Sequence, residues 1–183
     1  MQDNQSRSTR VCCADYPSRV SPFAQCKLVR VVRGAVWDVA VGIRRSSATF
    51  GQWVGVELNE DNHKQVWIPP GFAHGFVVLS ESADFLYKTT AYYAPSHDRC
   101  IRWDDSKINI DWPIPNNAVR LSDKDFADQI LSVTEVFNKK DIAANNHRHS
   151  NELQGRGIRA SPHGFSQLLI CSTTSVFRPP AKA

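Results

Sequence analysis

Three side chains in the first half of the chain could take part in proton chemistry: His74, Tyr87 and Lys27. His74 lies in Gly71-Phe-Ala-His-Gly75, directly after two prolines. Glycines on both sides of a histidine let a ligand approach the backbone closely, so a small-molecule site at a barrel mouth is one interpretation. The other is a structural histidine at the entrance of a strand, and the spacing favours neither.

Tyr87 belongs to Phe85-Leu-Tyr-Lys88, where strand alternation places Phe85 and Tyr87 on one face. A tyrosine that points into a barrel can donate a proton, although most such tyrosines fill the core. Lys27 begins a predicted strand and would by default be exposed. Lys124 and Asp125 have two interpretations: a solvated charge with a helix cap, or members of a site.

A metal centre is not expected. Catalytic zinc or iron needs about three clustered ligands, whereas His63, His74 and His97 lie on separate turns with no HxH or HxxxH spacing in the predicted barrel. The sequence gives no sign of another cofactor. The pair Arg44-Arg45 predicts a turn surface, and no basic face for nucleic acid accumulates around it.

The segment that must position these residues reads as short β-strands. Runs rich in β-branched and aromatic residues alternate with turn signals from Gly, Pro and Asn. The predicted strands are residues 27–33, 35–41, 50–58, 65–68, 75–79, 84–93 and 100–103. This pattern predicts an all-β fold, an antiparallel jelly-roll barrel, with a short capped helix towards residue 131.

Charge divides the 183-residue chain into two parts. Residues 1–133 hold 15 basic and 15 acidic side chains, whereas residues 134–183 hold 7 basic and 3 acidic ones. All five Trp and all four Tyr precede residue 113. We therefore expect one domain over residues 1–133 and a basic, irregular, poorly ordered tail over residues 134–183.

Several classes of protein are excluded by composition. No apolar run is long enough to cross a membrane, and the first ten residues contain no apolar signal-peptide core. The expected location is the cytoplasm, without a membrane partner. The five cysteines form no CxxC pair, so we read them as small buried residues or accidental thiols rather than a disulfide framework.

A long collinear stretch adds a family resemblance. From Lys27 to about Asp125 the sequence closely resembles the dTDP-4-dehydrorhamnose 3,5-epimerase family of deoxysugar cupins, and Met1 to Arg10 also resembles a family segment. The segments that carry the resemblance are Lys27-Leu-Val-Arg-Val-Val-Arg-Gly-Ala-Val-Trp-Asp-Val-Ala-Val41, Ser47-Ala-Thr-Phe-Gly-Gln-Trp-Val-Gly-Val-Glu-Leu58, Trp67-Ile-Pro-Pro-Gly-Phe-Ala-His-Gly-Phe76, Phe85-Leu-Tyr-Lys-Thr-Thr90, Tyr92-Tyr-Ala-Pro95 and Ile110-Asp-Trp-Pro113.

The resemblance implies a metal-free isomerase that exchanges protons at C3 and C5 of a dTDP-linked 4-keto-6-deoxyhexose, on the way to dTDP-L-rhamnose and cell-surface polysaccharide. It assigns Tyr87 as the acid, Asp125 as the carboxylate that orients the base, and Lys27 as the cation beside the C4 oxygen. It also implies a homodimer that exchanges edge strands. Further substrate-contacting positions are matched by Gln2, Asp3, Asn4, His74, Asp98 and Lys124.

One departure concerns the base itself. The family carries its base in a Gly-Val-Leu-Arg-Gly-Leu-His stretch, but residues 11–22 here contain no histidine. Codons for residues 10–16 read in a neighbouring frame can spell Gly-Val-Leu-Arg-Gly-Leu, which suggests a frameshift. We also expect that the family's upstream segment is missing before Met1 and that the basic tail has no family counterpart.

Three hypotheses follow from this departure. The chain is a disrupted epimerase with greatly impaired activity, a catalytically inactive protein that binds a sugar nucleotide, or the product of a nonfunctional reading frame. Losing a general base typically costs about 10²- to 10⁴-fold in rate.

Overall fold

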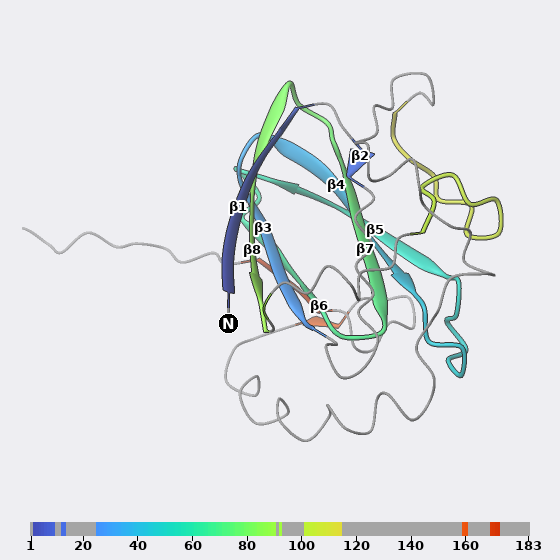
Figure 1. Cartoon of the computed structure of the whole chain (residues 1–183). Coiled ribbons are helices and arrows are strands. Elements are labelled where there is room, and N and C mark those ends of the chain that lie inside the picture. Colours follow the sequence, from blue (N-terminus) through green and yellow to red (C-terminus); the bar gives the residue numbers. More distant parts are fainter. Residues whose placement is uncertain are drawn as a thin grey trace, which may run out of the picture.

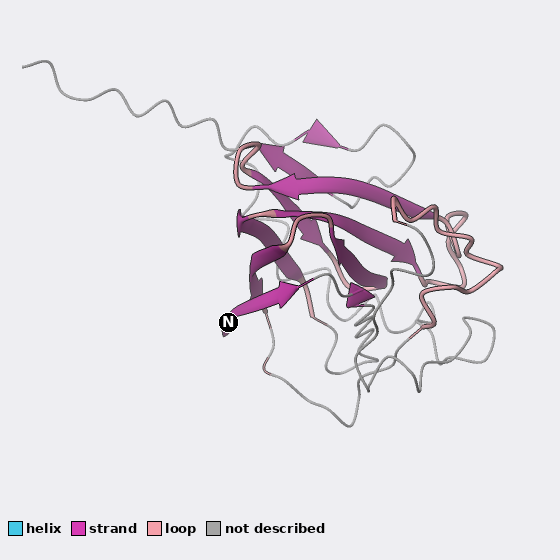
Figure 2. Cartoon of the chain, turned by 90° about the horizontal axis from the view of Figure 1, so that it is seen from above, coloured by secondary structure: helices cyan, strands magenta, loops and turns pink. Residues whose placement is uncertain are grey.

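Two antiparallel β-sheets lie face to face and form the body of the protein (Figures 1 and 2). The computed structural model describes residues 2–9, 25–90, 92 and 101–114, together with the backbone of residues 12–13, 159–160 and 169–172. Helix is absent from these described residues. The predicted all-β antiparallel fold is therefore confirmed.

Sheet A contains six strands in the order β1-β8-β3-β6-β10-β9. Their bounds are β1 Gln2–Thr9, β3 Lys27–Arg33, β6 Lys64–Ile68, β8 Ser82–Thr89, β9 Arg159–Ala160 and β10 Leu169–Ser172. Sheet B contains four strands in the order β2-β7-β4-β5. Their bounds are β2 Cys12–Cys13, β4 Ala35–Gly42, β5 Trp53–Asn59 and β7 Phe72–Val78.

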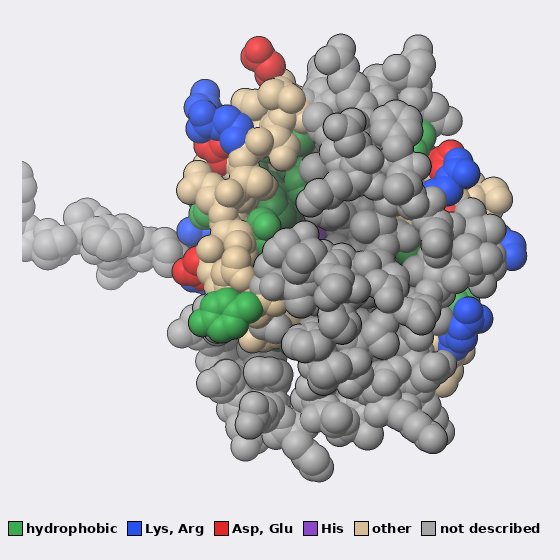
Figure 3. Space-filling model, viewed as in Figure 1, with side chains coloured by type: hydrophobic (Ala, Val, Ile, Leu, Met, Phe, Trp, Pro, Cys, Tyr) green, Lys and Arg blue, Asp and Glu red, His purple; other side chains and the backbone are tan. Residues whose placement is uncertain are grey.

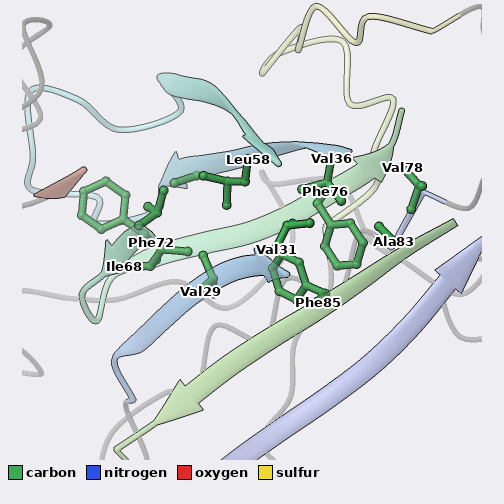
Figure 4. Packing of buried hydrophobic residues seen from close by; sticks show 12 residues of the cluster. Val29, Val31, Val36, Leu58, Ile68, Phe72, Phe76, Val78, Ala83 and Phe85 are labelled. Carbon is green, nitrogen blue, oxygen red and sulfur yellow. The ribbon is translucent and has the colours of Figure 1, made fainter. Parts of the chain in front are cut away.

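The core lies between the two sheets because their inner faces alternate apolar residues with residues that face outward. Sheet A contributes Val29, Val31 and Phe85, and sheet B contributes Val36 and Phe76. Figure 4 shows Phe76 and Phe85 meeting between the sheets, and their ring centroids are 4.4 Å apart. Burial of these side chains supplies the main driving force for closing the sheets.

A second apolar cluster covers the outer face of sheet B. There Val39 and Val41 of β4 pack with Ile101 and Ile108 from the segment after the strands. Four tryptophans pack around this cluster at residues 37, 53, 103 and 112. Both faces of β4 are therefore covered by protein, which explains its nearly continuous burial.

The structure differs from the sequence-based prediction in three elements. β1 is a full strand paired with β8, although its polar sequence gave no strand signal. Ile101 makes only an isolated bridge where a strand over residues 100–103 was predicted. In the range predicted as an irregular tail, β10 pairs with β6 and β9 pairs with β10. The predicted helix near residues 127–131 lies outside the described residues.

Candidate functional site

A buried histidine and a buried aspartate meet on the inner face of sheet B. The register of β4 against β7 places Asp38 opposite Phe76 and Ala40 opposite His74. Asp38 and His74 are therefore diagonal neighbours on the same face of the sheet. Nε2 of His74 lies 2.7 Å from Oδ2 of Asp38. Asp38 is 1% exposed and His74 is 6% exposed.

This geometry assigns the two nitrogens of the imidazole. A carboxylate only accepts hydrogen bonds, so Nε2 carries the proton that it shares with Asp38. Nδ1 then holds the lone pair when the ring is neutral. A histidine held in this way can take a proton at Nδ1, and the carboxylate stabilises the imidazolium that forms.

Aromatic rings line the space beside the pair. The His74 ring is stacked on Phe85 of the opposite sheet, with centroids 6.0 Å apart and planes at 21°. It is tilted towards Phe76 at 6.5 Å. Tyr87 follows on the same face of β8, with its ring centroid 6.1 Å from that of Phe85. The residues thus run from the imidazole on sheet B to the phenol on sheet A.

Lys27 lies on the inner face of sheet A, and the default expectation that it is exposed was wrong. It is only 9% exposed, because it precedes Val29 and Val31 in the same alternation. Lys27 pairs with Thr89 of β8, and Val29 pairs with Tyr87. A buried ammonium and a phenol therefore occupy neighbouring positions of one inner face. Figure 3 shows the charged side chains of the described residues on this face mainly at its left and right edges.

β1 divides the three neighbouring positions predicted to contact substrate. Gln2 and Asn4 lie on its half-buried face, and Nε2 of Gln2 donates to Oδ1 of Asn4 at 2.9 Å. Asn4 pairs with Tyr87 across the strands. Asp3 lies on the other face, where its carboxylate accepts from Nζ of Lys88 at 2.8 Å. The structure thus places Gln2 and Asn4 on the side of Tyr87, and Asp3 on the opposite side.

The remaining predicted positions Asp98, Lys124 and Asp125 lie outside the described residues. Asp38 is the residue that the sequence reasoning did not single out. The sequence does contain a sign of its role. Asp38 is the charged residue in an otherwise apolar strand, and the alternation places it on the same face as Val36 and Ala40. A buried carboxylate at such a position needs a hydrogen-bonding partner, and His74 supplies it.

Other site types find less support among the described residues. In that part of the chain no group of three or more His, Cys, Asp or Glu residues is arranged to hold a metal ion. No described helix is long and apolar enough to cross a membrane. A groove of about 270 Å³ is lined by the outward-facing residues Asp3, Leu28, Arg30, Gln65, Leu86 and Lys88 of sheet A, and also by Asn4 and Tyr87. His74 is not among its lining residues.

Comparison with known proteins agrees with the geometry. The family model for dTDP-4-dehydrorhamnose 3,5-epimerase matches residues 1–133. A dTDP-4-dehydrorhamnose 3,5-epimerase of Pseudomonas aeruginosa is 56% identical over 137 residues, covering 75% of each chain. The corresponding enzyme of Shigella flexneri is 53% identical over 137 residues, again covering 75% of each chain.

A similar solved structure is dTDP-6-deoxy-D-glucose-3,5-epimerase from Legionella pneumophila in complex with dTDP-4-keto-L-rhamnose. It is 50% identical, has a TM-score of 0.68 and is matched over 73% of this chain and 70% of its own. The epimerase of Sulfolobus tokodaii is 45% identical, with a TM-score of 0.68 and coverage of 75% and 74%. The chain therefore belongs to the dTDP-4-dehydrorhamnose 3,5-epimerase family.

Proposed function

We propose that the chain converts dTDP-4-dehydro-6-deoxy-D-glucose to dTDP-4-dehydro-L-rhamnose, at a rate lowered by the loss of the family's histidine from residues 11–22. The observation that carries the proposal is the placement of Lys27, His74 and Tyr87 on the two inner faces of the barrel. The register thus puts a cation and a phenol on the inner face of sheet A and an imidazole on the inner face of sheet B.

The chemistry of the substrate explains why such groups suffice. A ketone at C4 acidifies the hydrogens on C3 and C5, so a base can remove either proton and leave an enolate. The Lys27 ammonium would stabilise the negative charge that develops on the C4 oxygen. Tyr87 would return a proton to the carbon from the opposite face, which inverts the centre. Each exchange removes one proton and restores one, so no oxidant or reductant is required.

Substrate recognition would draw on other positions. Gln2, Asn4 and His74 are proposed to contact the substrate from the barrel interior, as are Asp98 and Lys124 from outside the described residues. Asp125 is proposed to orient the family's base, so it has this role only in a variant in which that histidine is restored. Asp3 is proposed as a contact only if its ion pair with Lys88 opens, because that pair lies on the outer face.

A second candidate function is binding of the sugar nucleotide without turnover. It is favoured by the absence of histidine from residues 11–22, while Lys27, His74 and Tyr87 are retained. Calorimetric titration with the dTDP-sugar separates the two candidates when combined with an isotope measurement. Binding without uptake of solvent deuterium at C3 or C5 supports the second candidate, and slow uptake supports the first.

Restoring the missing segment tests the cause of the impairment. In this variant the family's Gly-Val-Leu-Arg-Gly-Leu-His stretch replaces the corresponding part of residues 11–22. Deuterium uptake is expected to rise by about 10²- to 10⁴-fold, the usual contribution of a general base. A folded variant with no gain contradicts the proposed impairment. Tyr87→Phe, made in the restored variant, is the matched loss-of-function variant, because it keeps the ring and removes the acidic hydroxyl.

We further propose that the chain acts in the cytoplasm as a homodimer and without a cofactor, as the family resemblance implied. Among the described residues β1 pairs with β8 on one side, which leaves an edge that another strand could join. Light scattering on the purified protein measures the mass directly, and a monomer at all accessible concentrations contradicts the dimer.

A further inference from the structure

We propose that His74, oriented by Asp38, is the general base for proton exchange in this chain, and this inference rests on the proposed function. The segment in which the family carries its base lacks histidine, so another group must accept the proton if exchange occurs at all. His74 is the described histidine on an inner face of the barrel. His63, the other described histidine, is exposed in a turn with φ of 50°.

The contact with Asp38 prepares His74 for this role. The Nε2 to Oδ2 distance of 2.7 Å fixes the ring orientation and leaves Nδ1 as the accepting nitrogen. Both side chains are almost fully buried, so water competes little for the contact. When Nδ1 takes a proton from carbon, the electron pair of the broken C–H bond moves into the enolate. The new imidazolium is stabilised by the Asp38 carboxylate.

His74 and Tyr87 also occupy opposite sheets. Phe85 neighbours both, with its ring centroid 6.0 Å from that of the imidazole and 6.1 Å from that of the phenol. Inversion at a carbon needs a base and an acid on different faces of the sugar ring. A base from sheet B and an acid from sheet A meet this requirement without any group from residues 11–22. Asp38 touches the base and not the substrate, so it is a positioning residue.

The test measures uptake of solvent deuterium at C3 and C5, by mass spectrometry and NMR, in the unmodified 183-residue chain and three variants. His74→Gln removes the imidazole but keeps a polar side chain of similar reach. Asp38→Asn keeps the shape but no longer favours the required tautomer. His63→Asn is the control, because it removes an exposed histidine and asparagine tolerates positive φ.

His74→Gln is expected to lower the exchange rate by about 100-fold or more. Asp38→Asn should lower it by at least about 10-fold and change the pH dependence of exchange, because the asparagine cannot stabilise an imidazolium as a carboxylate does. His63→Asn should stay within about twofold of the unmodified chain. Affinity for the dTDP-sugar, measured by calorimetry, should change by less than about threefold in Asp38→Asn and His63→Asn, because neither residue touches the substrate. His74→Gln is expected to weaken binding as well, because His74 is also proposed as a substrate contact.

Chemical rescue keeps the test decisive if the glutamine variant folds poorly. His74→Gly leaves space for free imidazole, and added imidazole should restore exchange in proportion to its concentration. The inference is overturned if His74→Gln folds and exchanges at the unmodified rate. It is also overturned if His74→Gly exchanges undiminished without imidazole. A different outcome would contradict the proposed function itself. In that outcome the unmodified chain binds the sugar nucleotide, but neither it nor any variant takes up deuterium.

Discussion

Arg7 of β1 and Asp84 of β8 stand directly opposite each other and form a two-pronged ion pair. Nε of Arg7 donates to Oδ1 of Asp84 at 2.6 Å, and Nη2 donates to Oδ2 at 2.8 Å. Such paired contacts are stronger and more directional than single ones. This contact therefore adds a side-chain link to the backbone ladder that joins β1 to β8.

We predict that Arg7→Gln destabilises the fold in a pH-dependent way. The hydrogen bond from Arg7 holds the pKa of Asp84 below its usual value. A carboxyl whose pKa is lowered on folding stabilises the protein above its unfolded pKa of about 3.9, and this contribution is lost as the pH falls through the folded pKa. The midpoint of urea unfolding should therefore be lower for Arg7→Gln at pH 7, and the difference should shrink towards pH 3.

Lys88→Gln is the matched control for Arg7→Gln. Lys88 pairs with Asp3 on the same two strands, but their side chains are 55% and 69% exposed. Solvent screens such a pair, so its removal should change stability little. A difference for Arg7→Gln that stays the same from pH 7 to pH 3 would count against the assigned role of Asp84.

The buried pair of Asp38 and His74 gives a second prediction. Asp38→Leu leaves the buried Nε2 of His74 without its partner and should cost about 1–3 kcal/mol in the free energy of unfolding. Replacing both residues by leucine removes the unpaired group as well, so the double variant should be more stable than Asp38→Leu alone. Urea unfolding followed by tryptophan fluorescence measures both. Equal loss in the single and double variants would show that the pair is not coupled.

Gly55 and Trp37 give a third prediction, about packing. A Cβ at Gly55 would collide with Cζ2 of the Trp37 indole, on the neighbouring strand. Gly55→Ala should therefore overpack this position and cost about 1–3 kcal/mol. The penalty should be smaller in a Trp37→Phe background, because phenylalanine lacks the indole atoms Cζ2, Cε2 and Nε1 that the new methyl group would meet. Thermal unfolding of the four proteins yields the coupling, and an unchanged penalty would exclude this contact as the cause.

The thiol of Cys26 gives a fourth prediction. Burial raises its pKa from 9.0 to about 11, partly offset by a hydrogen bond with Thr90. Because the thiolate is the reactive form, this shift alone should slow alkylation near neutral pH by about 100-fold. Peptide mapping after brief iodoacetamide treatment should find Cys26 unmodified in the native protein and modified in urea. Equal labelling in both states would contradict its burial.

The strands from β3 to β8 could be predicted because each has an apolar inner face that alternates with residues facing outward. That alternation is local, and burial of the inner face enforces it. β1 could not be found in this way, since its residues are polar and its pairing depends on β8, some eighty residues away. The contact between Arg7 and Asp84 is a property of the register rather than of either sequence segment.

The candidate site was predictable only in part. The role of His74 stayed open, because spacing does not reveal the partner of a histidine. Asp38 supplies that partner from another strand. Lys27 was expected on the surface because a lysine at a strand start usually reaches solvent, but its parity with Val29 places it inside. In both cases the register between strands decides the environment of a polar side chain, and no single segment encodes that register.

The pairing of β10 with β6 places Leu169–Ser172 along a strand of sheet A whose second side would otherwise be open. β6 pairs with β3 on one side and with β10 on the other. A chain ending near residue 133 would keep the part that matches the family model but would leave the main-chain groups of β6 on that side uncovered. Uncovered strand edges recruit strands from other molecules. We therefore expect a protein shortened to residue 133 to self-associate more readily than one that retains β10.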